Sequence, residues 1–139
     1  MTPVDMASLH ARCFDAPAPW SAASFATLLN DPQVLLIDDP QARGFALLRV
    51  VLDEAELLTL AVDPAFRRLK IAHNLVGRID TLAPERGAAS IFLEVREDNL
   101  AARALYAACG YRQIGRRAGY YRAHNGARTA ALILCKSLA

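Results

Sequence analysis

The sequence predicts a mixed α/β (α+β) fold: a central sheet whose first strands form an antiparallel meander, with helices on both faces. Two observations carry this prediction. The chain has 139 residues and is 54% apolar, which suits one domain with a packed core. Its periodic segments run as two helices, three strands, a helix, a strand, a helix and two strands, an order typical of mixed sheets. We therefore expect residues 1–139 to form a single domain.

The N-terminal half supplies the first two helices and the meander. An apolar face at helical spacing over residues 6–14 indicates the first helix. Ser21 is a typical N-cap for a second helix, which the Asp31-Pro32 pair ends. Strand patterns then follow one another with short turns between them, over residues 34–37, 45–51 and 56–62.

The C-terminal half alternates helices and strands. Apolar residues step by three and four over residues 68–83, which predicts an amphipathic helix that stops before Pro84. Asn99 is a typical N-cap for a short helix over residues 100–108, and Gly110 closes it. Three more strands are predicted, over residues 90–95, 111–117 and 129–135.

Charge is divided unevenly along the chain. The formal net charge is +2, but residues 1–66 hold three basic and nine acidic side chains, whereas residues 67–139 hold thirteen and five. The basic half favours an anionic ligand such as a phosphate-bearing small molecule. No direct nucleic-acid binding is expected, because the basic residues are mostly single or paired and only Tyr120 and Tyr121 stand among them.

Other classes of protein are disfavoured. The apolar run at residues 130–135 is far shorter than the roughly 18–20 residues of a membrane span, and no secretory leader is recognisable. The three cysteines are widely spaced, which favours a reduced, cytoplasmic protein without a metal. The three histidines lack partners at the spacing of a hydrolase triad or metal site, so we interpret them as packing or surface residues.

Residues 60–72 run from a strand through a basic loop directly into a helix. Free backbone N–H groups and the positive end of the dipole at that helix start, together with Arg67, Arg68 and Lys70, favour a bound phosphate or pyrophosphate. The same pattern also occurs at solvated helix starts, so it needs independent support.

That support comes from a resemblance. The spacing Arg67-x-x-Lys70-x-Ala72 is similar to the acyl-CoA pyrophosphate loop of the GNAT N-acetyltransferase superfamily, Q/R-x-x-G-x-G/A. Within this superfamily the chain resembles the RimI-type enzymes, which acetylate protein N-termini. The similar segments occur in the same order over nearly the whole chain: residues 19–21, 50–55, 61–64, 93–96, 99–102, 105–106, 110–111 and 116–121.

The resemblance implies a GNAT-like, mostly antiparallel sheet with a splayed parallel strand pair, and acetyl-CoA as cosubstrate. The residues implied to bind acetyl-CoA are Leu60, Ala61, Val62, Arg67, Arg68, Leu69, Lys70, Ile71, Ala72, Asn99 and Tyr106. Lys70 stands where the family has a glycine. Because glycine permits a close backbone approach and a positive φ, this departure bears directly on affinity for the cosubstrate.

An amine acetyltransferase presents a neutral amine to the thioester carbonyl, stabilises the oxyanion and protonates the leaving thiolate. The resemblance implies Glu94 as the general base and Tyr106 as the acid. A strand glutamate between two core residues can face the cleft, and a tyrosine hydroxyl can hydrogen-bond a thiolate. The residues implied to line the peptide side are Arg117, Tyr120 and Tyr121, next to Arg116.

The implied reaction is acetylation of a protein N-terminus, that of a small-subunit ribosomal protein with a small first residue, by a monomer or weak dimer. The acidic N-terminal half would suit a basic protein tail if it borders the peptide channel. Two alternatives stay open. One is a GNAT enzyme for a lysine side chain, polyamine or antibiotic, and the other is a non-catalytic acyl-CoA-binding or partner-docking protein.

Overall fold

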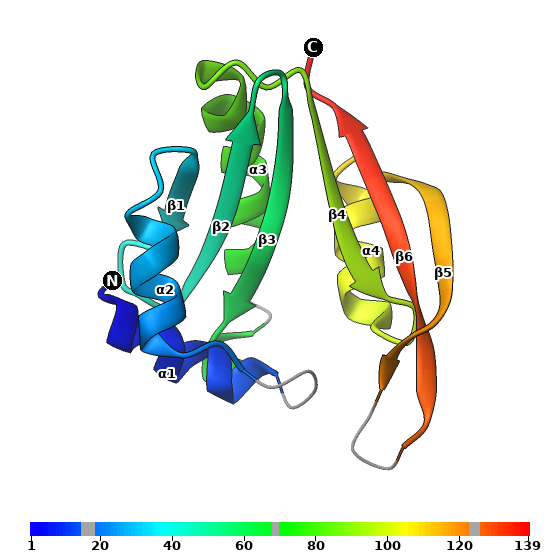
Figure 1. Ribbon diagram of the computed structural model, residues 1–139, viewed down its shortest axis with the longest axis horizontal. Coiled ribbons are helices and arrows are strands. Elements are labelled where there is room, and N and C mark those ends of the chain that lie inside the picture. The colour runs from blue at the N-terminus through cyan, green and yellow to red at the C-terminus, as the bar shows by residue number, and fades with distance from the viewer. Residues whose placement is uncertain (15–18, 68–69, 123–125) are drawn as a thin grey trace.

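The computed structural model describes residues 1–14, 19–67, 70–122 and 126–139. Two helices come first, three strands follow, and the rest of the chain runs helix, strand, helix and two strands (Figure 1). Their bounds are α1 (Pro3–Cys13), α2 (Ala22–Leu29), β1 (Val34–Asp38), β2 (Gly44–Val51), β3 (Glu54–Val62), a 3-10 turn (Pro64–Phe66), α3 (Ile71–Glu85), β4 (Ser90–Arg96), α4 (Leu100–Ala108), β5 (Arg112–Arg122) and β6 (Arg128–Ser137).

The six strands form one sheet in the order β1-β2-β3-β4-β6-β5 (Figure 1). The first three strands make the predicted antiparallel meander, and β4, β6 and β5 also pair antiparallel. The described strands β3 and β4 run parallel, and their ladder is confined to residues 54–56 opposite residues 90–92. Beyond this ladder the two strands diverge (Figure 1), which confirms the predicted splayed pair.

Helices cover both faces of the sheet, as predicted. Successive residues of a strand point to opposite faces. In β2, Phe45 and Leu47 therefore pack with α1 and α2, whereas Ala46 and Leu48 pack on the side of α3. Helices α1 and α2 lie over β1–β3, so this face of β4, β6 and β5 carries no helix of the described chain (Figure 1).

The start of α3 differs from the predicted helix over residues 68–83. Lys70 has left-handed backbone angles, φ 61° and ψ 21°, so the helix begins only at Ile71. Arg68 and Leu69 lie outside the described residues. The apolar spacing could not reveal this break, because a single left-handed residue hardly changes the hydrophobic pattern.

The end of α3 also differs, because the helix continues through Pro84 to Glu85. Proline removes an N–H donor, which is tolerable in a last turn where other donors close the helix. Here Gly87 donates its N–H to the carbonyl of Pro84, and Ala88 donates to that of Ala83.

The second half follows the predicted order, with a longer hairpin. Asn99 caps α4, and Gly110, with φ 92°, ends it. Strand β5 continues beyond residue 117 to Arg122, because β6 supplies ladder partners as far as Arg128. No helix of the described ranges has the length and apolarity needed to cross a membrane.

Candidate active site

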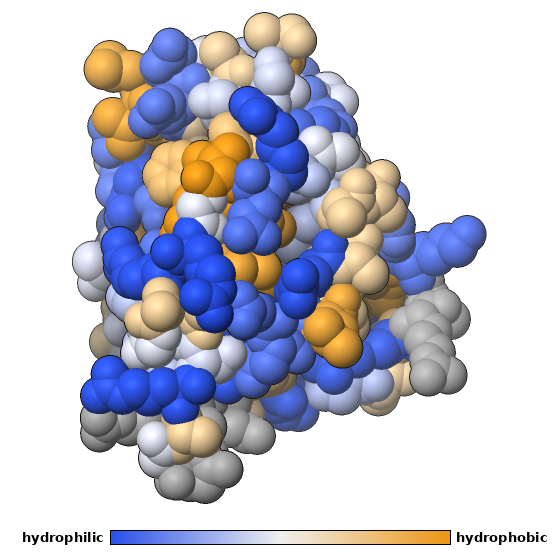
Figure 2. Space-filling model, turned by 90° about the vertical axis from the view of Figure 1, so that its right-hand side faces the viewer, coloured by the Kyte–Doolittle hydropathy of each residue, from blue (hydrophilic) through white to orange (hydrophobic). Residues whose placement is uncertain are grey.

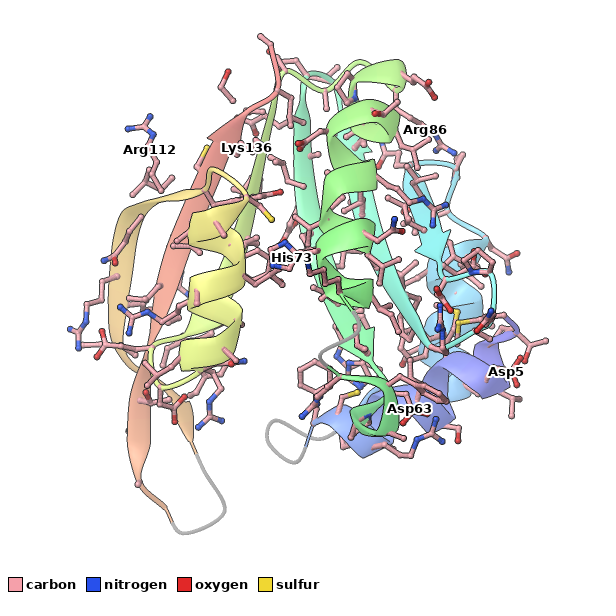
Figure 3. All side chains as sticks on the ribbon, turned by 180° about the vertical axis from the view of Figure 1, so that it is seen from behind. Asp5, Asp63, His73, Arg86, Arg112 and Lys136 are labelled. Carbon is pink, nitrogen blue, oxygen red and sulfur yellow. The ribbon has the colours of Figure 1, made fainter. Side chains whose placement is uncertain are left out.

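A cleft of about 1230 Å³ opens where β3 and β4 diverge. Its lining comes from both faces of the sheet: α1 and the chain before α2 on one face, and the start of α3 with α4 on the other. The separation of the two halves is visible from behind, between α3 and α4 (Figure 3). The cleft therefore joins the two faces of the sheet, so that two ligands could meet from opposite sides.

One wall of the cleft is the free edge of β3. Pairing with β4 ends at Glu56, so residues 57–62 have no ladder partner on this edge. Because successive N–H groups of a strand alternate between its two edges, every second residue here directs its N–H into the cleft. On the opposite edge, β2 approaches closely at Gly44, where an added Cβ would lie 2.9 Å from the carbonyl oxygen of Ala61.

The start of α3 forms a basic end of the cleft. Arg67 and Lys70 line it next to Ile71 and Ala72. The first N–H groups of a helix lack intrahelical acceptors, and the side chain of the N-cap residue Lys70 makes no capping hydrogen bond to them. The N–H groups, the helix dipole and the two cations together favour an anion.

Glu94 and Tyr106 bring a carboxylate and a phenol into the same cleft. Glu94 is exposed on β4 between the buried Leu93 and Val95. Tyr106 lies on α4 with its ring packed edge-to-face on Tyr111, the ring centroids 5.5 Å apart. Burial raises the pKa of Tyr106 above the ordinary tyrosine value, so its hydroxyl stays protonated at neutral pH.

Asn99 and His73 line the cleft on the side of α3 and α4. The Asn99 side chain accepts the N–H of Ala102 at 3.1 Å, so its capping role and its place in the cleft coexist. His73 points from the first turn of α3 towards α4 (Figure 3), and its Nδ1 lies 3.9 Å from the sulfur of Cys109.

An aromatic group lines the cleft on the other face: His10, Phe14 and Trp20. The Nδ1 of His10 accepts a hydrogen bond from the backbone N–H of Trp20 at 3.2 Å. The centroids of the His10 and Phe14 rings are 4.4 Å apart. Burial lowers the pKa of His10 to about 4, so the imidazole is neutral at physiological pH. His10 is a packing residue, as predicted, but it also faces the cleft.

Arg96 and Tyr121 line the β4 and β5 side of the cleft. The Arg96 guanidinium lies 5.6 Å from the centroid of the Tyr121 ring. It also binds both carboxylate oxygens of Asp98, at 3.1 and 3.0 Å.

The cleft contains every described residue to which the sequence assigned catalysis or acetyl-CoA binding: Leu60, Ala61, Val62, Arg67, Lys70, Ile71, Ala72, Glu94, Asn99 and Tyr106. Arg68 and Leu69 lie outside the described residues.

The residues assigned to the peptide side divide into two groups. Tyr121 lines the cleft, whereas Arg117 and Tyr120 pack on each other outside its lining, the guanidinium 4.5 Å from the ring centroid. Arg116 also points elsewhere, towards Glu97, which it binds at 2.6 Å.

Sequence reasoning missed the aromatic group and Arg96. Strand alternation could have indicated Arg96, because it shares a face of β4 with Glu94. Nothing in the spacing of His10 and Trp20 indicates the cleft, because these residues reach it only through the packing of α1 against the sheet.

The N-terminal half borders the cleft, but among the described residues none of its acidic side chains lies in the lining, so the suggested fit to a basic protein tail gains no support there. Those among residues 1–66 that line the cleft are apolar side chains, His10, Cys13 and Thr59. The carboxylates in the lining, Glu94 and Asp98, come from the basic half. Some acidic residues of the first half form ion pairs outside the cleft lining: Asp39 pairs with Arg43, and Asp63 pairs with Arg12.

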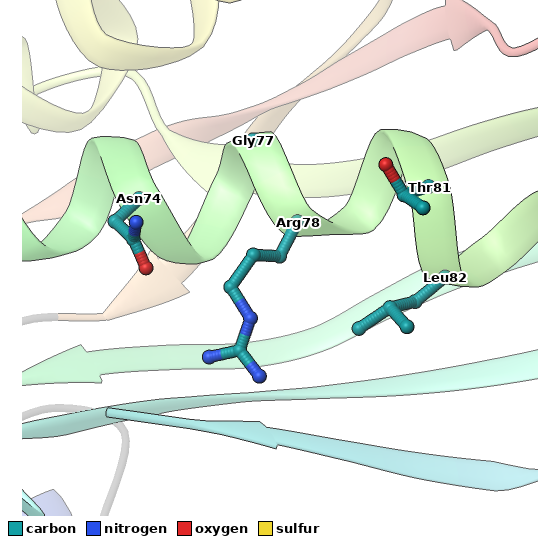
Figure 4. Close-up of a pocket in the computed structure, with 5 residues that line it drawn as sticks. All are labelled: Asn74, Gly77, Arg78, Thr81 and Leu82. Carbon is teal, nitrogen blue, oxygen red and sulfur yellow. The ribbon is translucent and has the colours of Figure 1, made fainter. Parts of the chain in front are cut away.

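A second, smaller hollow of about 410 Å³ lies on the surface of α3 (Figure 4). Its lining residues are Asn74, Gly77, Arg78, Thr81 and Leu82. The Arg78 guanidinium already donates to the carbonyl of Asp38 at 2.7 Å. No residue assigned to a site from the sequence lies in this hollow.

A sheet splayed at its parallel pair, with an anion-favouring helix start at one end of the opening, is the arrangement expected of an acyl-CoA-dependent transferase. The Acetyltransferase (GNAT) family model matches residues 4–111. The chain belongs to this family and is an acyltransferase.

Its similar relatives include the [Ribosomal protein bS18]-alanine N-acetyltransferases of Haemophilus influenzae and Escherichia coli K12. The first is 35% identical over 121 residues, covering 84% of this chain and 80% of the relative. The second is 34% identical over 117 residues, covering 83% and 79%.

Solved structures agree with this fold. The crystal structure of the ribosomal-protein-S18-alanine N-acetyltransferase from Escherichia coli matches with a TM-score of 0.87 and 31% identity, covering 99% of this chain and 88% of that chain. Arabidopsis thaliana NAA60 in complex with acetyl-CoA matches with a TM-score of 0.81 over 99% of this chain and 95% of that chain. At 19% identity, this second likeness shows the fold alone.

Proposed function

We propose that the protein is an acetyl-CoA-dependent N-α-acetyltransferase acting on the N-terminus of a small-subunit ribosomal protein. The cleft through the sheet carries this proposal, because donor and acceptor can meet there from opposite faces, with Glu94 and Tyr106 both in the lining. The relatives named for bS18 alanine acetylation support this acceptor and a small first residue.

Acetyl-CoA would enter between α3 and α4. The N–H groups at the start of α3, with Arg67 and Lys70, suit its pyrophosphate. Arg68 and Leu69 belong to the same proposed loop. The free edge of β3 offers N–H groups to the pantetheine arm and to the thioester oxygen, and Asn99 lies where it could also contact the arm.

The acceptor amine would enter from the open face near Tyr121. An N-terminal amine has a pKa of about 7.7–8.0, against about 10.4 for lysine, so it is partly neutral at cellular pH and needs only a modest base. Glu94 takes the amine proton, directly or through water, as the nitrogen attacks the thioester carbonyl. The N–H groups of β3 stabilise the resulting oxyanion.

Tyr106 is proposed to stabilise the thiolate that leaves from the thioester. Its raised pKa makes full proton transfer to a thiolate, whose parent thiol titrates near about 8.5, unfavourable as a separate step. Tyr106 therefore acts as a hydrogen-bond donor that stabilises the charge developing on the sulfur as the C–S bond breaks. A proton that it passes to the sulfur is replaced from solvent, and Glu94 releases the amine proton to solvent, so both residues return to their starting state.

Three further assignments complete the proposal. Tyr121 contacts the peptide within the cleft, and Arg117 with Tyr120 contact it beyond the cleft lining. The reaction takes place in the cytoplasm, where the three free thiols of Cys13, Cys109 and Cys135 would stay reduced.

The test is acetyl transfer to a short peptide beginning with alanine, followed as release of CoA thiol. Tyr106→Phe should lower kcat about 100-fold. Tyr111→Phe is the matched control, because the Tyr111 hydroxyl is buried without a hydrogen-bond partner among the described residues. Its removal should leave turnover unchanged and the fold equally or more stable.

Other results would point elsewhere. Full activity of both Glu94→Gln and Tyr106→Phe would contradict the assigned roles. Transfer to lysine side chains or small amines in place of the peptide would favour another acceptor. Binding of acetyl-CoA without transfer to any amine of the panel would favour a docking protein.

A further inference from the structure

Arg96 is a cleft residue to which the proposed reaction gives no role. Its side chain is 24% exposed, and its guanidinium lies between a ring and a carboxylate. The ring is that of Tyr121, 5.6 Å away, and the carboxylate is that of Asp98, held through two hydrogen bonds. A planar guanidinium can satisfy both contacts at once.

Arg96 and Tyr121 line the same cleft as Glu94. Residues two apart in a strand share a face, so Arg96 stands beside Glu94 on the open face of β4. Burial raises the pKa of Tyr121, and the charges of Glu94 and Tyr120 raise it further, whereas Arg96 and Arg117 both lower it. The charges of Glu94 and Arg96 therefore both act on the Tyr121 hydroxyl within one wall of the cleft.

Asp98 connects this wall with the proposed acetyl-CoA site. It lies two residues beyond the end of β4 and directly precedes Asn99, the N-cap of α4 in the proposed acetyl-CoA site. The Arg96–Asp98 pair thus connects the ring of Tyr121 on β5 with the loop that begins α4.

We propose that Arg96 is a positioning residue for the acceptor: anchored by Asp98, it holds the Tyr121 ring beside Glu94, so that the incoming amine meets the base against a fixed wall. The inference rests on the proposed N-α-acetyltransferase function. It predicts that losing Arg96 weakens acceptor binding much more than it affects acetyl-CoA.

The neighbouring pair Arg116–Glu97 provides a matched control. It is also bidentate, at 2.6 and 3.2 Å, and it holds the residue just before Asp98. Arg116 is 50% exposed, belongs to β5 and lies outside the cleft lining. The side of the molecule on which β5 and β6 lie shows many hydrophilic side chains with hydrophobic ones between them (Figure 2). A purely structural need for an arginine at this loop would affect both pairs alike.

The experiment compares Arg96→Met and Arg116→Met in the full-length protein with a peptide beginning with alanine. Calorimetry on the CoA-bound protein gives the peptide Kd, and steady-state kinetics give KM and kcat. Arg96→Met should raise the peptide Kd and KM about five- to tenfold, the size of one well-placed cation–π contact, with kcat and the KM for acetyl-CoA within about twofold. Arg116→Met should change none of these beyond about twofold. Arg96→Lys should restore only part of the loss, because an ammonium cannot bind bidentately.

A second readout needs no turnover. In NMR titrations of tyrosine ring carbons, Arg96→Met should move the Tyr121 titration to higher pH, while Arg116→Met should leave it in place. The inference is overturned if both variants weaken the peptide equally, or if the Tyr121 signal ignores the loss of Arg96. A wild-type protein that binds the peptide without acetylating it would contradict the proposed function, while the Kd comparison would still decide the role of Arg96.

Discussion

Lys70 adopts a left-handed backbone conformation that glycine tolerates and residues with a Cβ rarely adopt. Its φ of 61° is left-handed, a conformation that costs a residue with a Cβ roughly 1–2 kcal/mol. The same residue lines the cleft and is the N-cap of α3, so it brings a positive charge to the end of the cleft where the helix begins. We infer that the chain accepts backbone strain at Lys70 because the residue adds a positive charge where the proposed pyrophosphate binds.

Lys70→Gly should therefore separate the two effects. We expect the variant to gain about 1 kcal/mol in stability, a rise of about 3–5 °C in Tm, because the strain disappears. Its Kd for acetyl-CoA should rise several-fold at low salt, and the salt dependence of binding should weaken. Thermal unfolding and calorimetry at two salt concentrations measure both.

Lys70→Ala is the control for this prediction. It removes the charge but keeps a Cβ at the left-handed position, so it should bind acetyl-CoA less tightly without the gain in Tm. Equal or tighter binding by Lys70→Gly would show that the ammonium contributes nothing to the site.

At the scale of elements, His10 links α1 to the start of α2. Helix α1 is well specified locally by a capping box between Thr2 and Asp5. Its place on the sheet depends on burial of His10, whose Nδ1 accepts the backbone N–H of Trp20. That bond requires an unprotonated Nδ1, so protonation breaks the link between the two helices.

The stability of the fold should consequently fall in mild acid. An unfolded histidine takes up its proton near about pH 6.5, whereas His10 in the fold does so only near a pKa of about 4. The unfolded state binds more protons between these values, so the free energy of unfolding decreases as pH falls through this window, by up to about 3 kcal/mol. Chemical denaturation at pH 7, 5.5 and 4.5 measures the effect.

His10→Phe should abolish this dependence, with some loss of stability at pH 7 because the Trp20 N–H is left unpaired. His73→Asn, at an exposed position, should retain the wild-type pH dependence. The hydrogen-bonded Asp39, whose pKa Arg43 lowers to about 2, affects stability mainly below this window. An unchanged slope in His10→Phe would exclude His10 as the source.

At the scale of the whole molecule, two halves meet along a narrow seam. The ladder of β3 and β4 joins them over three residue pairs. Side chains add links from α3 to the other half: Asp80 binds Lys136 at 2.7 Å, and His73 contacts Cys109. The cleft is the space that this short seam leaves open.

Hydrogen exchange should report the free edge of β3. Amides of residues 57–62 that face the cleft should exchange faster than their neighbours bonded to β2. Acetyl-CoA should slow the exposed set at least about tenfold and leave residues 54–56, already in the ladder, unchanged. Uniform protection along β3 in the free protein would mean that the edge is not open in solution.

The sequence by itself determined the order of elements, because helix caps, turn residues and hydrophobic period act locally. It also placed Glu94, since alternation in β4 puts it opposite Leu93 and Val95, and it placed Asn99 as a cap. Local signals of this kind survive folding because each depends on only a few neighbouring residues.

Only the tertiary structure decided what lies across the cleft from these residues. The place of His10 and Trp20 in the cleft and the contact of Arg96 with Tyr121 depend on segments that only folding brings together. The free edge of β3 is the clearest case, because it arises from where pairing with β4 stops. The physical reason is that close packing and strand pairing are properties of segments brought together, which no local pattern encodes.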